Sequence, residues 1–333
     1  MEAMTPVWDI GAGSQPQRAD RHARTCIFGW LSVLLLCLGT VELVMAQEER
    51  ALRRIVVDDR QTAQDILQQL RQGASFSALA RARSLGAEAS QWGYSGTVRL
   101  SEMQPAMRAV VQKLKEGQTS DVLELGRQFV ILKAISPRIA RHFEAAEQAE
   151  RAKKFPQALQ EIQAALRLEE DNVQAHMKLG LIEQGTKKFG EAIRHFEKAQ
   201  QYAPQEAQVA LFVATAYTHA ATESQNTAQA EKAMQAFQRV LQLDGRYAPS
   251  VHFGLGKVYL LALRQPDKAI DYLTKAAEAT TSVAEPHRLL IKAYYDMQRY
   301  EQAWQTLRRA QDMGFDFPDL LAALQKTKQQ SQR

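Results

Sequence analysis

The chain has 333 residues, of which 45% are hydrophobic and 24% are charged, and its formal net charge is +5 at pH 7. Acidic and basic residues alternate along the chain without a basic cluster, which argues against nucleic acid as a partner. Both cysteines, Cys26 and Cys37, lie in one apolar N-terminal stretch, so the rest of the chain has no thiol for a disulfide or a thiolate metal site. The histidines show no ligand spacing and no phosphate-binding loop occurs, so we expect neither a metal nor a cofactor.

The apolar stretch at residues 26–46 follows three arginines and ends in small residues. A basic region, an apolar core and a small-residue cleavage site are typical of a secretory signal peptide. An uncleaved membrane anchor is the alternative, because about 20 apolar residues span a bilayer, although Glu42 disfavours a full span. Either way, residues 1–46 make the only membrane contact, and the rest is exported to the periplasm or the outer face of the cytoplasmic membrane. The long leader leaves the true start codon open.

Residues 51–137 alternate between strand-like and helix-like patterns. The segment 53–57, which ends in Ile-Val-Val, predicts a strand, and apolar residues at helical spacing over 62–72 predict an amphipathic helix that ends at Gly73. The later elements are predicted as a second helix near 76–80, a strand after Trp92-Gly93-Tyr94, a helix at 107–114, and closing strands at 122–123 and 129–134. The predicted order is a strand, helices, a strand, a helix and two strands.

Six short phrases in this segment carry a family resemblance. They are Arg54-Ile55-Val56-Val57, Phe76 to Ala80, Trp92-Gly93-Tyr94, Met103 to Met107, Leu114 to Ser120 and Gly126 to Lys133. Together with the order of elements, they make this segment resemble a parvulin-type peptidyl-prolyl isomerase, also called a rotamase. The resemblance implies an α+β fold, with a four-stranded antiparallel sheet wrapped by helices. It also implies rotation about X-Pro bonds, a process whose uncatalysed barrier is about 18–20 kcal/mol.

In that family, apolar residues hold the proline ring, and two histidines with a Cys or Asp form a polar floor. The resemblance places Met103, Met107 and Phe129 at apolar positions, while the histidine positions carry Arg54 and Val130. We therefore predict a substrate-binding site in which the three apolar residues hold the proline ring and Arg54 is a cation near the bound carbonyl. The alternative is that the apolar residues belong to the core and that Arg54 is a surface residue of an edge strand.

The polar floor of the family is incomplete in this sequence. No cysteine is available here, and the loop at 84–88 offers only Glu88 as an acid. The loop at 95–97 also looks like a small insertion. These substitutions leave the catalytic residues unassigned, so the sequence does not decide between an active enzyme and a binding module.

The C-terminal two-thirds of the chain repeats with a period of about 34 residues. Equivalent residues are Phe155 and Phe189, Ala158 and Ala192, Ile162 and Phe196, and Ala165 and Ala199. Small residues let two helices cross closely while large ones fill the groove between them, and the pattern resembles the tetratricopeptide repeat. The resemblance implies an all-α solenoid of five repeats at 139–317, followed by a capping helix and tail at 318–333. A polar stretch at 220–227 predicts a longer loop between the helices of the third repeat.

In tetratricopeptide arrays, the first helix of each repeat lines a concave face. The residues expected to point outward from these helices are Phe143, Met177, Leu181, Leu211, Phe253, Lys257, Arg288, Lys292 and Tyr295. The early repeats would offer an apolar surface and the late repeats three cations, which suits a peptide with an apolar part and an acidic end. A solvated basic face is the alternative.

These patterns together predict an α+β domain followed by an all-α solenoid in an exported protein that binds proteins or peptides, among them proline-containing clients. We expect an envelope chaperone or scaffold whose isomerase-like domain contacts extended segments and whose repeats hold a client or partner. Two alternatives stay open: an active isomerase that assists the folding of exported proteins, and a structural component of a secretion or polysaccharide-export assembly. Neither the partner's identity nor the oligomeric state follows from the sequence.

Overall fold

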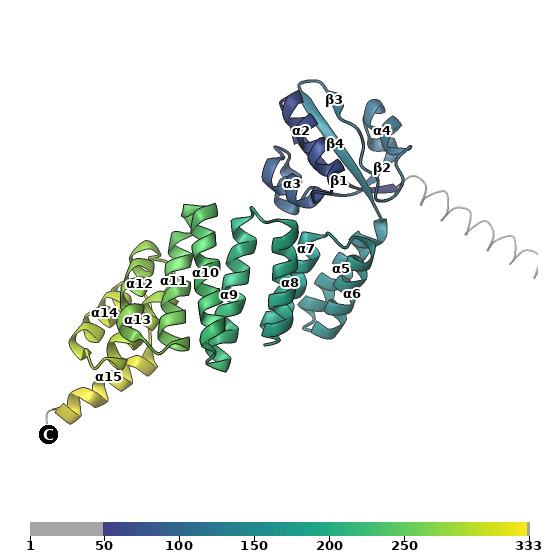
Figure 1. The fold of residues 1–333 in the computed structure, drawn as a ribbon. Coiled ribbons are helices and arrows are strands. Elements are labelled where there is room, and N and C mark those ends of the chain that lie inside the picture. The colour runs from purple at the N-terminus through teal and green to yellow at the C-terminus, as the bar shows by residue number, and fades with distance from the viewer. Residues whose placement is uncertain (1–48, 332–333) are drawn as a thin grey trace, which may run out of the picture. The chain divides into compact units, whose positions relative to one another are not determined.

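The computed structural model describes residues 49–331. The predicted signal peptide or anchor at residues 1–46 lies outside this range. Among the described residues, no helix has both the length and the apolar character needed to cross a membrane. Strands and short helices make up the chain as far as residue 135, and paired helices follow from residue 137 (Figure 1).

Four strands form one sheet in the order β2-β1-β4-β3. The strands are β1 (Glu49–Val57), β2 (Tyr94–Arg99), β3 (Leu123–Leu125) and β4 (Gln128–Ile135). Strands β1 and β4 pair antiparallel with Val56 opposite Val130, and β3 turns back onto β4 through Gly126, whose φ of 65° suits glycine. The helices of this part are α2 (Arg60–Arg71), α3 (Phe76–Arg83), the 3-10 turns η1 (Ala87–Gln91) and η2 (Leu100–Glu102), and α4 (Pro105–Val111).

Side-chain caps explain where the first helices begin. The carboxylate of Asp59 accepts a hydrogen bond from the backbone N–H of Thr62, and the hydroxyl of Ser75 accepts one from the N–H of Ala78. Each cap satisfies a backbone donor that has no partner within its helix. The sequence therefore fixes the starts of α2 and α3 locally.

Two sequence-based boundaries in this part were wrong. The helix predicted at 107–114 ends at Val111, and the segment 95–97, predicted as an inserted loop, belongs to strand β2. Leu114 lies beyond the end of α4 but packs against the same apolar cluster as α4. The apolar spacing therefore predicted its burial correctly, although this residue is not helical.

The two faces of the sheet carry separate cores, because successive residues of a strand point to opposite sides. The α2–α3 face is the side on which these residues pack together: Ile55, Val57, Phe129 and Ile131 with Ala63, Ile66, Phe76 and Ala80. The α4 face is the opposite side, with the cluster Leu52, Val56, Val130, Leu132, Ala134, Leu100, Val111, Met103 and Met107. Each face therefore has its own helical cover.

Paired helices follow, each next to its neighbour in the chain (Figure 1). They are α5 (Pro137–Arg151), α6 (Phe155–Leu168), α7 (Val173–Gly185), α8 (Phe189–Tyr202), α9 (Ala207–Ser224), α10 (Thr227–Leu243), α11 (Ala248–Lys257), α12 (Pro266–Ala279), α13 (Ala284–Asp296), α14 (Tyr300–Asp312) and α15 (Pro318–Ser331). A 3-10 turn, η3 (Gly245–Tyr247), precedes α11, and a π-helical turn, η4 (Val258–Ala262), continues it.

Small residues are required where these helices meet. A Cβ added at Gly180 would lie 2.7 Å from the ring of Phe196, and one added at Gly254 would lie 2.0 Å from the ring of Phe237. Both distances are far below van der Waals contact, so a larger residue would force the helices apart. The structure confirms the predicted fold class: a four-stranded antiparallel sheet with helices, followed by an all-α solenoid of paired helices.

The loop predicted at 220–227 is wrong. Helix α9 continues to Ser224, and only Gln225 and Asn226 separate it from α10. The hydroxyls of Thr222 and Ser224 donate to the carbonyls of Thr218 and Ala220, four residues back. Their polar groups are thus satisfied on the helix itself, and the extra residues lengthen the helix instead of forming a loop.

A buried charge cluster joins the sheet to the helices. Arg53 on β1 is 0% exposed, and its guanidinium donates to the carboxylate of Glu169 at 2.8 Å and to the backbone oxygen of Trp92 at 2.8 Å. Lys133 Nζ lies 3.0 Å from Glu169, and the amide of Asn172 also donates to that carboxylate. Burial alone would raise the pKa of Glu169, but Arg53 and Lys133 more than offset it and lower the pKa to about 2.

Candidate functional site

The α4 face presents an ion pair between Arg54 on β1 and Glu88 in η1. The connecting loop is fixed to the strand, because the hydroxyl of Ser84 accepts from the N–H of Val56 at 3.0 Å and the N–H of Leu85 donates to the carbonyl of Val56 at 2.7 Å. These bonds hold the carboxylate beside the guanidinium. Both side chains are partly exposed, at 33% for Arg54 and 18% for Glu88.

This ion pair leaves polar atoms unused. Arg54 Nε and Glu88 Oε2 are buried atoms without a hydrogen-bond partner among the described residues. A buried donor without a partner carries a desolvation penalty, which a ligand or water can relieve. The ion pair is thus partly exposed and retains one hydrogen-bond donor and one acceptor without a partner.

Met103 and Met107 lie on the same face, half-buried against a cluster that includes Val130. The guanidinium of Arg108 donates to the carbonyls of Ser101 and Met103, at 2.9 and 3.0 Å, and so holds the segment that carries both methionines. Methionine is flexible and adapts to irregular apolar ligands. The structure therefore brings Arg54 and the two methionines to one side of the sheet.

Phe129 does not join them, and its predicted place in the same pocket was wrong. It packs on the α2–α3 face, whereas its neighbour Val130 packs on the α4 face. The alternation of side chains along a strand already forbids adjacent residues from sharing a face. Because Val130 packs on the α4 face, Phe129 points the other way.

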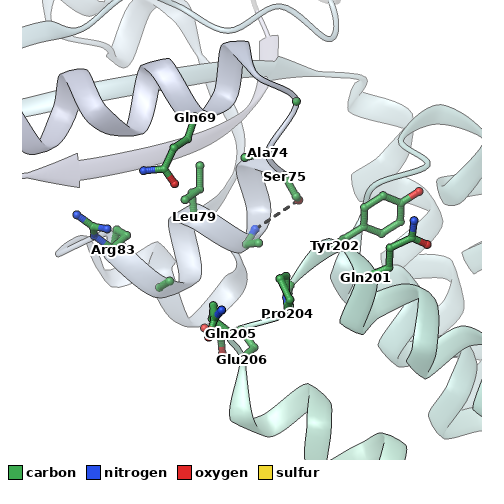
Figure 2. Close-up of a pocket in the computed structure, with 14 residues that line it drawn as sticks. Gln69, Ala74, Ser75, Leu79, Arg83, Gln201, Tyr202, Pro204, Gln205 and Glu206 are labelled. Carbon is green, nitrogen blue, oxygen red and sulfur yellow. Dashed lines mark hydrogen bonds between the residues drawn. The ribbon is translucent and has the colours of Figure 1, made fainter. Parts of the chain in front are cut away.

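A pocket that the sequence analysis missed lies between α2–α3 and the turn from α8 to α9 (Figure 2). It encloses about 490 Å³. Its lining comprises Gln69, Gly73, Ala74, Ser75, Ala78, Leu79, Ala82 and Arg83 from the first part, and Gln201, Tyr202, Ala203, Pro204, Gln205 and Glu206 from the second. Most of the lining is apolar, and Gln69, Gln201 and Gln205 contribute side-chain amides. No motif could have revealed it, because its two walls are far apart in the sequence.

A histidine pair lies beside this pocket, in which the ring of His176 stacks on Tyr202 with centroids 5.8 Å apart. His176 Nδ1 and His195 Nδ1 are 3.1 Å apart, and His176 Nε2 lies 3.2 Å from the carbonyl oxygen of Glu170. A carbonyl only accepts, so His176 carries its proton on Nε2 and accepts at Nδ1 from His195. Nε2 of His195 then lies 3.7 Å from the carboxyl of Glu183.

The apolar residues expected on the concave face of the early helices are partly covered. Met177 is only 8% exposed and packs in a cluster with Trp92 and Val209. Phe143 packs against Ala51 of β1. Both were predicted as outward-facing partner-binding residues, and the structure corrects this because the sheet part covers them. Leu181, in contrast, is 41% exposed, and Leu211 packs half-buried on the core of the third helix pair.

The cations predicted on the late helices are not free. Arg288 pairs with Glu285 at 2.7 Å, and Lys292 pairs with Asp296 at 3.0 Å. Lys257 is half-buried, and burial lowers its pKa. The structure thus shows a paired surface in which acidic residues neutralise much of the predicted basic patch.

The aromatic residues of this group are engaged as well. Phe253 lies under the ammonium of Lys257, with 5.6 Å between the nitrogen and the ring centroid. Tyr295 packs edge-on against Tyr300, with centroids 5.6 Å apart. Among residues 49–331, no group of three or more His, Cys, Asp or Glu residues is arranged to hold a metal ion.

Among the solved structures similar to this chain, two are described as TPR proteins. The TPR protein TTC0263 of Thermus thermophilus is 20% identical, with a TM-score of 0.45, covering 56% of this chain and 97% of that one. PilF of Pseudomonas aeruginosa is 19% identical, with a TM-score of 0.46 and coverages of 58% and 85%. YrrB, described as a TPR protein with an unusual peptide-binding site, is 20% identical, with a TM-score of 0.42 and coverages of 56% and 90%.

Sequence comparison identifies both parts of the chain. Over 121 residues, the chain is 29% identical to the chaperone SurA of Bordetella avium (strain 197N), a match covering 36% of this chain and 24% of SurA. The chain thus spans about a quarter of that relative's length. Residues 44–136 match the family of the PPIC-type PPIASE domain (rotamase), and residues 173–206 match the tetratricopeptide repeat family. The chain therefore carries a parvulin-type, PpiC-like peptidyl-prolyl isomerase domain followed by tetratricopeptide repeats.

Proposed function

We propose that this protein is an exported chaperone or scaffold whose PpiC-type domain binds extended, proline-containing segments of client proteins, while its repeats hold the client or an assembly partner. The similarity of the first domain to the chaperone SurA supports the chaperone role. The apolar stretch at residues 26–46 supports export to the periplasm or the outer face of the cytoplasmic membrane. The domain limits of 51–137 for the isomerase-like part, 139–317 for five repeats and 318–333 for the cap belong to the same proposal.

The observation that carries this proposal is the composition of the α4 face. Met103 and Met107 retain an apolar floor, while the family's histidine positions hold Arg54, paired with Glu88, and the buried Val130. An apolar floor is sufficient to bind a proline ring. Acceleration of rotation needs polar groups that favour the twisted amide over the planar one. Here the guanidinium of Arg54 already donates a hydrogen bond to the carboxylate of Glu88, which leaves it fewer donors for a twisted amide. This favours binding over catalysis.

An active isomerase is the second candidate. It is favoured by the unpartnered Nε of Arg54, which belongs to a guanidinium that is one-third exposed. A donor in this place can bond to a substrate carbonyl and stabilise the charge that develops as the amide twists. The two candidates share one binding face and differ only in rate acceleration.

The test uses the full chain and a labelled peptide with one X-Pro bond. Peptide affinity is measured by fluorescence anisotropy and isomerisation by a rate assay, for the wild type, Met107→Ala and Arg54→Ala. Leu85→Ala is the control, because Leu85 lies in the loop that leads to Glu88 and is 63% exposed.

We expect the wild type to bind without accelerating isomerisation, Met107→Ala to bind several-fold more weakly, and Leu85→Ala to match the wild type. If the wild type accelerates isomerisation and Arg54→Ala does not, the active isomerase would replace the scaffold as the proposed function. Absence of peptide binding by the folded wild type would reject both candidates for this face.

A further inference from the structure

A pocket between three helices near the end of the chain carries polar groups that the preceding proposal does not use. It encloses about 300 Å³ where α13 packs against both α12 and α14. We call it the α12–α14 pocket, and its lining includes Ala277 and Glu278 of α12, His287, Leu290 and Tyr294 of α13, and Arg309 of α14. The three residues of α13 share one face of that helix, because positions three or four residues apart are neighbours on a helix surface.

His287 contributes a buried polar atom without a partner. The residue is 3% exposed, and its Nε2 is buried and has no hydrogen-bond partner among residues 49–331. Burial, with Arg309 nearby, lowers the pKa of His287, so the ring is neutral and has one nitrogen that donates and one that accepts. A buried polar atom without a partner carries a desolvation penalty, which a polar ligand in the pocket relieves.

Two charges of opposite sign line the pocket without neutralising each other. Glu278 belongs to α12 and Arg309 to α14, and neither side chain forms an ion pair or a hydrogen bond in the part of the chain that the structure describes. On α13, by contrast, Arg288 pairs with Glu285 at 2.7 Å. A simple anion would meet the carboxylate of Glu278, and a simple cation would meet the guanidinium of Arg309. A suitable ligand therefore carries both a negative and a positive charge.

The size and the apolar part of the pocket define the ligand further. A volume of about 300 Å³ lies at the lower end of the range for small-molecule sites, and Ala277, Leu290 and Tyr294 pack together as an apolar wall. We propose that the α12–α14 pocket binds a free α-amino acid with an apolar side chain. The ligand carboxylate pairs with the guanidinium of Arg309, and its ammonium pairs with the carboxylate of Glu278. Its side chain packs against the apolar wall.

This proposal goes beyond the function proposed for the sheet domain and does not depend on it, since the pocket shares no residue with the α4 face. The two can be separated experimentally. Met107→Ala should leave amino-acid binding unchanged, and Arg309→Gln should leave binding of a peptide with one X-Pro bond at the α4 face unchanged.

Isothermal titration calorimetry on the full chain tests which ligand the pocket takes. The probes are L-alanine, L-valine, L-leucine and L-phenylalanine, and then the two analogues of the tightest-binding probe that lack either the amino group or the carboxyl group. We expect each analogue to bind at least about tenfold more weakly, because one charge of the pocket then has no counterion. No binding by any of the four amino acids, or an analogue that binds as tightly as its parent, would overturn the proposal.

Variants test where the amino acid binds. We expect about tenfold weaker binding in Arg309→Gln and in Glu278→Gln, and a few-fold loss in His287→Phe. Arg308→Gln and Asp271→Asn are the matched controls, because both residues are exposed on the same helices and do not line the pocket. Circular dichroism checks that each variant is folded. If His287→Phe does not fold, the two exposed positions decide the outcome, and unchanged affinity there, or an equal loss in the controls, would reject this pocket as the site.

Discussion

Individual buried charges join the sheet part of the chain to the helical repeats. Arg53 is buried with its partner Glu169, and Lys133 provides a second cation at the same carboxylate. Removing one member of such a cluster leaves the other charge unpaired in a poorly solvated place, which is more damaging than removing both. The cluster is therefore a point where single and double substitutions give different results.

We predict that Arg53→Met lowers the free energy of unfolding by about 3–5 kcal/mol, and that adding Glu169→Gln restores part of the loss. Urea unfolding followed by circular dichroism measures both. Arg71→Met is the control, because Arg71 and its partner Asp121 are 68% and 87% exposed and such surface pairs contribute little. A double variant less stable than Arg53→Met would contradict the role given to the pair.

The shifted pKa values of Glu183 and His195 predict a pH dependence of stability. Burial, with Glu191 nearby, raises the pKa of Glu183 to about 7 from 4.5, while burial, with His176 and Arg194, lowers the pKa of His195 to about 4 from 6.5. The contribution of Glu183 is complete below pH 4.5 and is lost as the pH rises through 7. That of His195 is complete above pH 6.5 and is lost as the pH falls through 4. Burial also lowers the pKa of His176, His219, His252 and His287, so the contribution of Glu183 is isolated by comparing the wild type with Glu183→Gln.

Between pH 4.5 and pH 8.5 the stability of the wild type should thus fall relative to that of Glu183→Gln, whose side chain does not titrate. Urea midpoints of both proteins at the two pH values test this. Glu116→Gln is the control, because Glu116 is exposed and lies in the sheet part of the chain. An equal difference between wild type and Glu183→Gln at both pH values would refute the raised pKa of Glu183.

At the scale of elements, the first helix of every pair ends in the same way. A residue other than glycine adopts a left-handed conformation just past each of these helices: Lys153, Lys187, Gln225, Arg264 and Gln298. Three of the five are followed by a residue whose N–H donates to a carbonyl five residues back, as the N–H of Lys188 does to Glu183. This is the Schellman ending, which favours glycine because a Cβ is strained there.

Lys187→Gly should therefore raise the free energy of unfolding by up to about 1 kcal/mol. Lys187 has a φ of 61° and an exposed side chain, so little else is lost. Lys188→Gly is the matched control, because its φ of −85° suits any residue and glycine there only adds freedom to the unfolded chain. Thermal unfolding should separate the two variants in opposite directions, and a lower midpoint for Lys187→Gly would exclude strain at this position.

The helical pairs could be predicted because their determinants are local and periodic. Ala158 and Ala192 recur one period apart, and each is fully buried between its helices. The stretch at 220–227 failed because serine and threonine favour turns in isolation, whereas here their hydroxyls bond to the preceding turn of α9. For the candidate site, the family resemblance suggested Arg54, Met103, Met107 and Phe129, but the face on which Phe129 packs required the strand register.

At the scale of the whole molecule, contacts between the sheet part and the repeats were invisible to sequence analysis. Trp92 is 5% exposed and packs with Val173, Met177 and Val209, while its carbonyl accepts from buried Arg53. These residues are distant in the chain and belong to no shared motif. Met177 was consequently assigned to a free surface.

Trp92→Ala should uncouple the sheet part from the repeats, because it removes the largest side chain of this cluster and leaves a cavity. We expect one calorimetric transition in the wild type and two in the variant, with hydrogen exchange in β1 becoming faster than in α13. Trp304→Ala, in the fifth helix pair, is the control and should leave exchange in β1 unchanged. A single transition in Trp92→Ala would mean that other contacts suffice.

The pocket between α2–α3 and the α8–α9 turn has a practical consequence (Figure 2). Its walls come from segments that only folding brings together, so an unfolded chain offers an occupant nothing to bind. Any compound that fills the pocket therefore raises the melting temperature, and at a concentration one hundred times its Kd it adds about 2.7 kcal/mol. A library can thus be screened on this protein by heating alone, before its client is identified.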